Sequence, residues 1–287
     1  MFYTFFCERN RIVAIIKPMA YIFWLITFLF GTFVGSFLNV VILRLNTGRT
    51  LGGRSHCQSC GKTLGAHELI PVLSYCVQRG KCTNCNSRIS AQYPIVEALT
   101  GLLFASIFWK YQVFLFTFFP YFVLISAYLI LIFTLLMVIF FYDLRHQIIP
   151  NALSYTFILL AFFVPFVLSN TMMMPYTWSL MTFLSGPLVA LPLFLLWAVS
   201  KGQWLGFGDV KLATGIGYML GVSGGFASLM LSFWIGGIVG VILLVIGRNS
   251  KKLTLKTAVP FAPFLIIGCT IAFFCSINLS NIISFIQ

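Results

Sequence analysis

The stretch PYFVLISAYLILIFTLLMVIFFY, from Pro120 to Tyr142, contains no charged residue and is long enough to cross a bilayer as one helix. A membrane span needs roughly 20 mostly apolar residues, because a helix satisfies its own backbone hydrogen bonds in lipid. The whole chain has the same character: of its 287 residues, 60% are hydrophobic and 8% are charged. These values lie outside the range of soluble domains and predict an all-α polytopic membrane protein.

Other apolar stretches lie on both sides of this one, and together they predict about eight transmembrane helices. The predicted spans lie near residues 20–43, 93–109, 120–142, 152–168, 178–199, 209–223, 226–247 and 259–280. The sixth is short and rich in glycine. The first is too long for the apolar part of a secretion signal and has no A-x-A-like cleavage site, so we interpret it as a retained span.

The basic residues indicate which loops face the cytoplasm, because cytoplasmic loops keep an excess of Lys and Arg. The first loop is strongly basic and contains one acid, Glu68. We therefore divide the chain into an N-terminal tail with the first helix (1–45), a cytoplasmic domain (46–92) and a transmembrane domain (93–287). The net charge of +13 follows from this topology. Its spread over many loops does not favour a nucleic-acid partner.

Four cysteines in the cytoplasmic domain form two C-x-x-C pairs, Cys57 with Cys60 and Cys82 with Cys85. Such pairs turn their sulfurs toward one ion and are typical of a structural zinc site, since four sulfur ligands leave no open position for water. Two disulfides or a redox-active C-x-x-C are the alternatives, and a cytoplasmic location argues against stable disulfides. We expect zinc to supply most of the stability of this polar, glycine-containing loop.

The chain has only two aspartates, Asp143 and Asp209. Asp143 ends the third predicted span and Asp209 begins the sixth, so both are expected at the cytoplasmic face. Each could be an ordinary interfacial residue paired with a nearby cation, Asp143 with Arg145 or His146 and Asp209 with Lys211. Two carboxylates at one depth, in a chain with no other aspartate, favour a functional pair instead.

Paired carboxylates can share one proton, so that the ionised member activates water while the protonated member polarises a carbonyl. This is the arrangement of the aspartic proteases. Gly206 and Gly208 precede Asp209 and suit such a site, because a residue without Cβ lets a substrate backbone approach closely. The sequence contains no nucleophile motif, zinc-protease motif or nucleotide-binding loop that would indicate other chemistry.

With these motifs in view, the chain resembles the type IV prepilin peptidases, a family of bifunctional leader peptidases and N-methyltransferases with a G-x-G-D intramembrane protease motif. The resemblance covers nearly the whole chain. Its stretches are GSFLNVVILRL at 35–45, the two C-x-x-C pairs, IPVLSY at 70–75, ISAQYPIVEALTGLLF at 89–104, YDLRHQIIPN at 142–151, GFGDVKL at 206–212 and VPFAPFL at 259–265. Asn151 departs from the family pattern, in which Asp is common at that position.

The resemblance implies that Asp143 and Asp209 are the catalytic aspartates. From the residues themselves, Gly206 and Gly208 are expected to support this site, and Lys211, two residues after Asp209, is expected to keep that aspartate the ionised member of the pair. The implied substrate is a prepilin or pseudopilin with a short basic leader and an apolar helix. The implied location is the bacterial inner membrane, where the chain contacts the lipid bilayer and cuts the leader on the cytoplasmic side. The pilus, secretion and competence systems that use such enzymes are not distinguished by the sequence.

A second activity is implied by the same resemblance. The family methylates the new N-terminal residue with S-adenosylmethionine, and the cysteine domain is associated with that step. On this basis Glu68 and Gly80 are expected to bind S-adenosylmethionine. Glu97, at the start of the second span, either pairs with Arg88 or recognises the charged leader or new amine of the substrate, and both readings stay open.

Three other functions compete with this one. The chain could be a peptidase only, with the zinc loop purely structural. A proton-coupled transporter would also use intramembrane carboxylates, but near the bilayer midplane and in related halves of the chain, and no repeat of that kind is visible. A non-enzymatic scaffold would dock partners through the zinc loop and would tolerate replacement of both aspartates.

Overall fold

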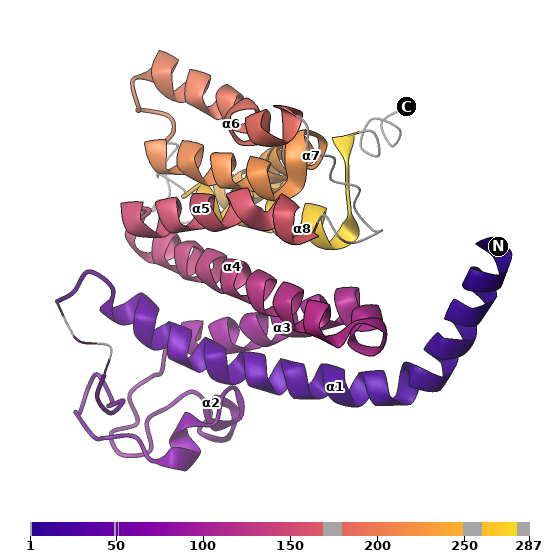
Figure 1. Cartoon of the computed structure of the whole chain (residues 1–287). Coiled ribbons are helices and arrows are strands. Elements are labelled where there is room, and N and C mark those ends of the chain that lie inside the picture. The colour runs from indigo at the N-terminus through magenta and orange to yellow at the C-terminus, as the bar shows by residue number, and fades with distance from the viewer. Residues whose placement is uncertain (1, 49, 51, 169–179, 249–259, 280–287) are drawn as a thin grey trace. The chain divides into compact units, whose positions relative to one another are not determined.

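The computed structural model describes residues 2–48, 50, 52–168, 180–248 and 260–279, and within them it is all-helical (Figure 1). The elements are α1 (Phe2–Arg44), η1 (Ala66–Leu69), α2 (Leu73–Val77), α3 (Gln92–Thr117), α4 (Phe119–His146), α5 (Asn151–Leu168), α6 (Leu180–Ser200), α7 (Phe207–Arg248) and α8 (Ala262–Cys275). The described residues form two isolated β-bridges and no strand, both bridges in the cysteine loop. The predicted all-α fold is confirmed.

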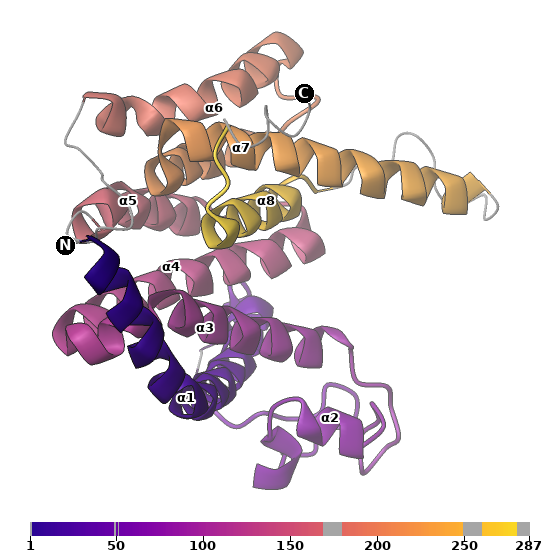
Figure 2. The same ribbon diagram turned by 90° about the vertical axis from the view of Figure 1, so that its right-hand side faces the viewer.

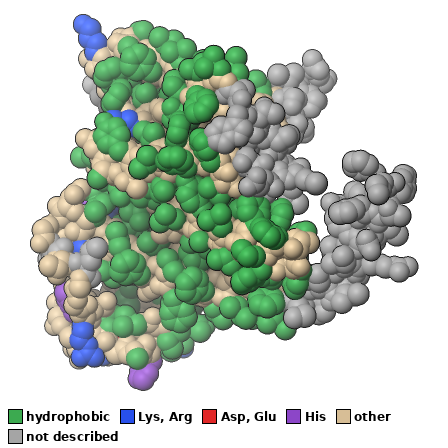
Figure 3. Space-filling view, viewed as in Figure 1, with side chains coloured by type: hydrophobic (Ala, Val, Ile, Leu, Met, Phe, Trp, Pro, Cys, Tyr) green, Lys and Arg blue, Asp and Glu red, His purple; other side chains and the backbone are tan. Residues whose placement is uncertain are grey.

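Six of the described helices are long and apolar enough to cross a membrane: α1 from Ala20 onward, α3, α4, α5, α6 and α7 up to Val245. The shorter apolar helix α8 corresponds to the eighth predicted span. Residues 169–179 and 249–259 lie outside the described part of the chain. Hydrophobic side chains cover most of the described surface in Figure 3, as expected for helices that are solvated by lipid.

Helix α7 combines the sixth and seventh predicted spans, and its backbone is broken at Gly221 (φ 72°, ψ 178°). Unbroken, the apolar 39 residues from Phe207 to Val245 would measure about 58 Å, against a hydrocarbon core of about 30 Å. The break falls in the glycine-rich part of the predicted sixth span, where a residue without Cβ reaches positive φ at little cost. Figure 2 shows the long second stretch of α7 beside α8.

The chain divides into two compact units, residues 1–134 and 135–287. In the first unit, α1 packs along α3. Glycines on both helices make this approach close: a Cβ on Gly35 would lie 2.7 Å from the Cα of Glu97, and one on Gly31 would lie 2.8 Å from the Cα of Gly101. Small residues of this kind are typical of helix contacts in membranes, where packing replaces the hydrophobic effect as the driving force.

In the second unit, α7 is the central element and packs against α5, α6 and α8. Gly215 lies against the ring of Phe157 on α5, and Gly217 lies against the Ser185 carbonyl on α6. Gly268 of α8 lies against Ser232 of α7. These close contacts hold α7 against its neighbours within the unit.

Candidate functional site

The two aspartates lie in the same unit of the chain. Asp143 is three residues from the C-terminal end of α4, and Asp209 is the third residue of α7. Both side chains are buried, with 4% and 8% of their surface exposed. The Asp143 carboxylate interacts electrostatically with that of Asp209. The fold thus brings together two acids that are 66 residues apart in the sequence.

No described cation forms an ion pair with either aspartate. Arg145 is exposed, and His146 packs its ring on Tyr142, with 4.5 Å between the ring centroids. The ammonium of Lys211 donates a hydrogen bond to Asn151 Oδ1 at 2.7 Å. Neither Asp143 nor Asp209 is therefore an ordinary interfacial residue that pairs with a neighbouring cation.

The two glycines before Asp209 differ in their surroundings. A Cβ on Gly208 would lie 3.1 Å from the Cβ of Ile149, so this glycine is needed for close packing in the unit. A Cβ on Gly206 would have the Asp209 carboxylate, at 3.6 Å, as its nearest neighbour. Gly206 thus leaves space beside a carboxylate, and Gly208 fixes the backbone that carries it.

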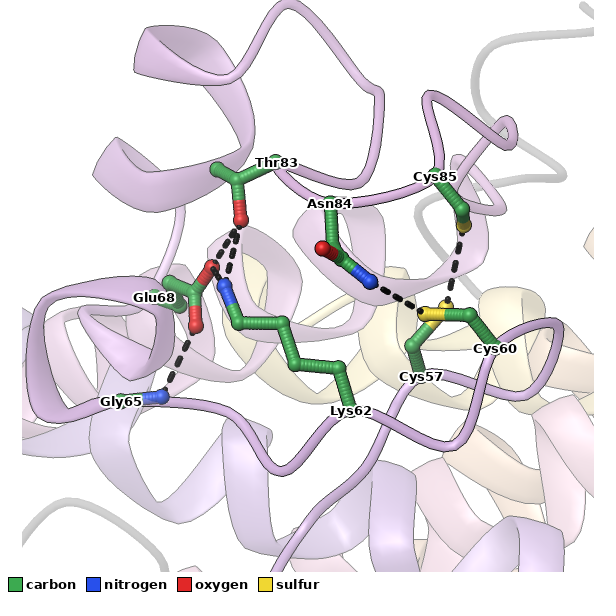
Figure 4. Close-up of polar contacts among 8 residues, drawn as sticks. All are labelled: Cys57, Cys60, Lys62, Gly65, Glu68, Thr83, Asn84 and Cys85. Carbon is green, nitrogen blue, oxygen red and sulfur yellow. Dashed lines mark hydrogen bonds and ion pairs between the residues drawn. The ribbon is translucent and has the colours of Figure 1, made fainter.

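The second site lies in the first unit. Cys57, Cys60, Cys82 and Cys85 carry sulfurs that all lie within 4.8 Å of one another. Figure 4 shows three of these cysteines, Cys57, Cys60 and Cys85. The sulfurs of Cys57 and Cys85 are 3.9 Å apart. A tetrahedral zinc ion with bonds of about 2.3 Å requires sulfur atoms about 3.8 Å apart, whereas a disulfide requires about 2 Å. The four thiols are free, and they could hold a metal ion.

The two cysteine pairs are built alike, with a shift of 25 residues between them. The Cys57 amide donates to the Lys62 carbonyl at 2.9 Å, and the Cys82 amide donates to that of Ser87 at 2.9 Å. The turns close at Gly61 (φ 71°) and Asn86 (φ 55°), two residue types that tolerate positive φ. Each pair is thus a tight turn that presents two sulfurs on one side.

Hydrogen-bond donors in these turns favour the thiolate form of two of the four cysteines, Cys57 and Cys85. Backbone amides of Cys60 and Ser59, together with the Ser87 hydroxyl, lower the pKa of Cys57 to about 6. The Ser87 hydroxyl and amide also lower the pKa of Cys85. Thiolates are the form that binds metal, so the turns prepare their sulfurs for an ion. The role of Ser87 does not follow from the sequence, because the C-x-x-C spacing does not indicate a hydroxyl that hydrogen-bonds to the cysteine sulfurs.

Glu68 joins the two cysteine turns. Its carboxylate accepts from Lys62 Nζ at 2.9 Å, from the Gly65 amide at 2.8 Å and from the Thr83 hydroxyl (Figure 4). Lys62 follows the first cysteine pair, and Thr83 lies inside the second. Thr83, Gly65 and Lys62 together lower the pKa of Glu68 to about 2. The acid is therefore ionised and fully engaged in holding the loop together.

Gly80 and Glu97 also have defined neighbours. Gly80 has φ 67°, and a Cβ there would lie 2.9 Å from the Tyr75 hydroxyl. Glu97 is buried in α3 and accepts hydrogen bonds from the Val72 amide at 2.7 Å and from Ser36. Glu97 is thus engaged by the loop and by α1, and it forms no ion pair with Arg88.

Fold and site define a class: a polytopic helical membrane protein with two buried, interacting aspartates in one unit and a four-cysteine loop in the other. Residues 29–111 match the bacterial Peptidase A24 N-terminal domain, and residues 129–241 match the type IV leader peptidase family. The chain belongs to the type IV leader peptidase family.

Similar curated proteins carry one name, prepilin leader peptidase/N-methyltransferase. That of Bacillus subtilis is 33% identical over 249 residues, which are 86% of this chain and 92% of the relative. Those of Pseudomonas aeruginosa and Vibrio cholerae are 30% and 29% identical, over 89% of this chain and 90% and 98% of the relatives. No solved structure matches the chain. The resemblance seen in the sequence is confirmed.

Proposed function

We propose that this chain cleaves the leader peptide of type IV prepilins or pseudopilins at the cytoplasmic face of the inner membrane, and then methylates the new N-terminal residue. The observation that carries the proposal is the pair of buried, interacting carboxylates of Asp143 and Asp209 in one unit, neither of them in an ion pair with a described cation. The names of the relatives support both activities.

The peptidase step is acid–base catalysis by the aspartate pair. One carboxylate takes a proton from water, and the oxygen of that water attacks the carbonyl carbon of the scissile peptide. The other, protonated, carboxyl donates its proton to the carbonyl oxygen. Collapse of the tetrahedral intermediate breaks the C–N bond, and a carboxyl gives a proton to the leaving amine. No covalent intermediate with the protein forms, and Gly206 provides room for the substrate backbone beside Asp209.

The position of the aspartates favours a peptidase over a proton-coupled transporter. Both lie within three residues of a helix end. At a rise of about 1.5 Å per residue, that places them within about 5 Å of the end of the helix. Proton relays of transporters lie near the bilayer midplane, about 15 Å from either end of the hydrocarbon core. A cut near the membrane face also suits a substrate with a polar leader and an apolar helix.

The cysteine cluster is proposed to hold one structural zinc ion. The donor set supports this: four sulfurs in two preformed turns, with donors that favour thiolates. Bound zinc would cross-link the two turns, and its four sulfur ligands leave no position for a substrate or water. Its contribution is therefore to stability of the loop.

Methyl transfer is proposed to take place at the cysteine domain. S-adenosylmethionine, when bound, supplies an activated methyl group for the new N-terminal amine. Glu68 and Gly80 are the residues proposed for this site, and their contacts suggest how they contribute. Three donors engage Glu68, and Gly80 gives the backbone a positive φ beside Tyr75. Both residues thus shape the surface on which the cofactor binds.

One reaction tests the whole proposal. The protein in bilayer nanodiscs is incubated with a prepilin, with and without S-adenosylmethionine, and the products are weighed by mass spectrometry. We expect loss of the leader in both reactions and the added mass of one methyl group only with the cofactor. Cleavage without methylation would show that the protein is a peptidase only, with a structural cysteine loop. An intact prepilin would refute the proposed function.

A further inference from the structure

The segment from Leu69 to Val77, which contains α2, exposes four of its apolar side chains. The exposed fractions are 41% for Leu69, 42% for Ile70, 61% for Leu73 and 81% for Val77. Leu69, Leu73 and Val77 are spaced four residues apart, and no charged residue occurs from Leu69 to Gln78. The rest of the cysteine loop is polar, so this apolar strip contrasts with its surroundings and requires a partner.

The polar residues of the same segment point the other way. Ser74 and Tyr75 are partly buried, while Leu73, Cys76 and Val77 are exposed. The Tyr75 hydroxyl lies next to Gly80. A helix at a water-facing surface buries its apolar side and exposes its polar side. This segment does the reverse, which is the pattern of a helix whose outer face meets lipid.

The depth of the segment is fixed by Glu97. The Val72 amide donates to Glu97 at 2.7 Å, and Glu97 lies five residues into α3, which begins at Gln92. Five residues of helix advance about 7 Å. Helix α3 has 26 residues, about 39 Å, so about 4 Å extends beyond each side of a 30 Å hydrocarbon core. Val72 is therefore tied to a point just inside the boundary between head groups and acyl chains.

The apolar strip adjoins surface that faces lipid. Phe33 and Phe37 of α1 are 59% and 54% exposed, and Ile95 of α3 is 49% exposed. These residues belong to helices that are long and apolar enough to cross the membrane, and they flank Ser36 and Glu97 in the sequence. Glu97 accepts from the Val72 amide and from Ser36, so the residue before α2 lies near both α3 and α1. The strip and the spans can thus share one lipid surface.

We propose that the Leu69–Val77 segment lies in the membrane interface, with its apolar side chains among the acyl chains of the leaflet on the side of the cysteine loop. An amphipathic segment in this position buries its apolar face about 5–10 Å into the boundary region, and the position of Val72 just inside that boundary is compatible with this placement. The segment holds the cysteine domain against the bilayer surface. This inference does not depend on the proposed catalytic activities.

A nitroxide at position 77 tests the inference in the full chain. Cys7, Cys76, Cys269 and Cys275 are replaced by Ala, the four metal-site cysteines are kept with zinc bound, and Val77→Cys is spin-labelled. Val77 is the most exposed residue of the strip, so the label does not disturb packing. Arg54→Cys, an exposed position in the same loop, is the matched control. Both proteins are placed in vesicles of phosphatidylethanolamine and phosphatidylglycerol.

The accessibility of each label to oxygen, which concentrates in lipid, is compared with its accessibility to a water-soluble nickel complex. We expect the oxygen-to-nickel ratio to be several-fold higher at position 77 than at position 54. Equal ratios would overturn the inference. So would a label shielded from both reagents, which indicates a protein contact, or a label that is shielded only when a prepilin is added, which indicates substrate docking.

A second measurement uses the native sequence, so it does not depend on the folding of the cysteine variants. Vesicles that contain a phospholipid with a photoreactive acyl chain are irradiated, and lipid adducts are mapped by mass spectrometry. Adducts in peptides covering residues 69–77 and not in those covering 55–64 support the inference. Adducts confined to the spanning helices refute it.

Discussion

Lys211, the fifth residue of α7, donates a hydrogen bond to the side-chain oxygen of Asn151, the first residue of α5, at 2.7 Å. Its ammonium also lies over the rings of Tyr155 and Phe207, 4.7 and 5.2 Å from their centroids. Lys211 therefore links the starts of two helices that carry or adjoin the aspartate site, and it does so without an ion pair to Asp209.

We predict from this contact that Lys211→Gln changes stability more than mechanism. The variant loses the contacts of the ammonium with the rings of Tyr155 and Phe207, and a cation–π contact at an exposed site is worth about 0.5–1 kcal/mol. Cleavage should persist with the pH profile of kcat unchanged, because Lys211 forms no ion pair with Asp209. The amide introduced by Lys211→Gln can still donate a hydrogen bond to Asn151. Lys211→Met is the matched variant that also removes the hydrogen bond. A shift of the pH profile in both variants would show that Lys211 tunes the aspartates directly.

Replacement of either aspartate should abolish proteolysis. Asp143→Asn and Asp209→Asn keep size and hydrogen-bonding capacity but remove the acid–base function, which is worth roughly 10²–10⁴-fold in rate. Cleavage of prepilin is measured by gel shift and mass spectrometry, with zinc content and membrane insertion as controls for folding. A variant that cleaves at the normal rate would remove that residue from the mechanism.

Loss of the metal site should affect methylation more than cleavage. Cys57→Ser with Cys60→Ser removes two of the four sulfurs, and the loop then loses the zinc cross-link that we propose stabilises it. The aspartates lie in the other unit and are not part of this loop. Zinc content, methylation and cleavage are measured on the same sample. Equal loss of both activities would show that the loop supports the whole fold.

Glu68→Gln should loosen the cysteine loop. The pKa of Glu68 is lowered to about 2 from an ordinary value of 4.5. Its stabilising effect is therefore complete above about pH 4.5 and is lost as the pH falls toward 2. At pH 7 the variant loses all of this effect, and we expect zinc to transfer to a chelator several-fold faster. His67→Gln, which changes the exposed neighbour, should leave the transfer rate unchanged.

Gly80→Ala should destabilise the loop by about 1–3 kcal/mol, because a non-glycine residue at positive φ is strained and the new methyl would meet the Tyr75 hydroxyl. Gly52→Ala is the control, since nothing lies within 4 Å of a Cβ at that position. Gly61→Asn should be tolerated, because Asn86 occupies the equivalent turn. Protease sensitivity of the loop measures all three. Equal sensitivity of Gly80→Ala and Gly52→Ala would contradict the packing argument.

Much of this protein follows from sequence. Apolar length alone predicts helices, because in lipid a backbone must satisfy its own hydrogen bonds. The spacing of Cys57, Cys60, Cys82 and Cys85 predicts that four sulfurs converge, since short turns determine that geometry locally. Because the chain contains few acids, the sequence also indicates Asp143 and Asp209 as candidate functional residues. These conclusions rest on composition and on local spacing.

The tertiary structure decided which side chains meet across long separations. Only the packing of α7 against its neighbours buries Asp209 so that it interacts with Asp143. The same packing directs Lys211 to Asn151, a partner that no local pattern indicates. In the loop, Glu68 meets Thr83, and the Val72 amide meets Glu97. Such contacts depend on the relative placement of distant segments, and sequence periodicity contains no information about that placement.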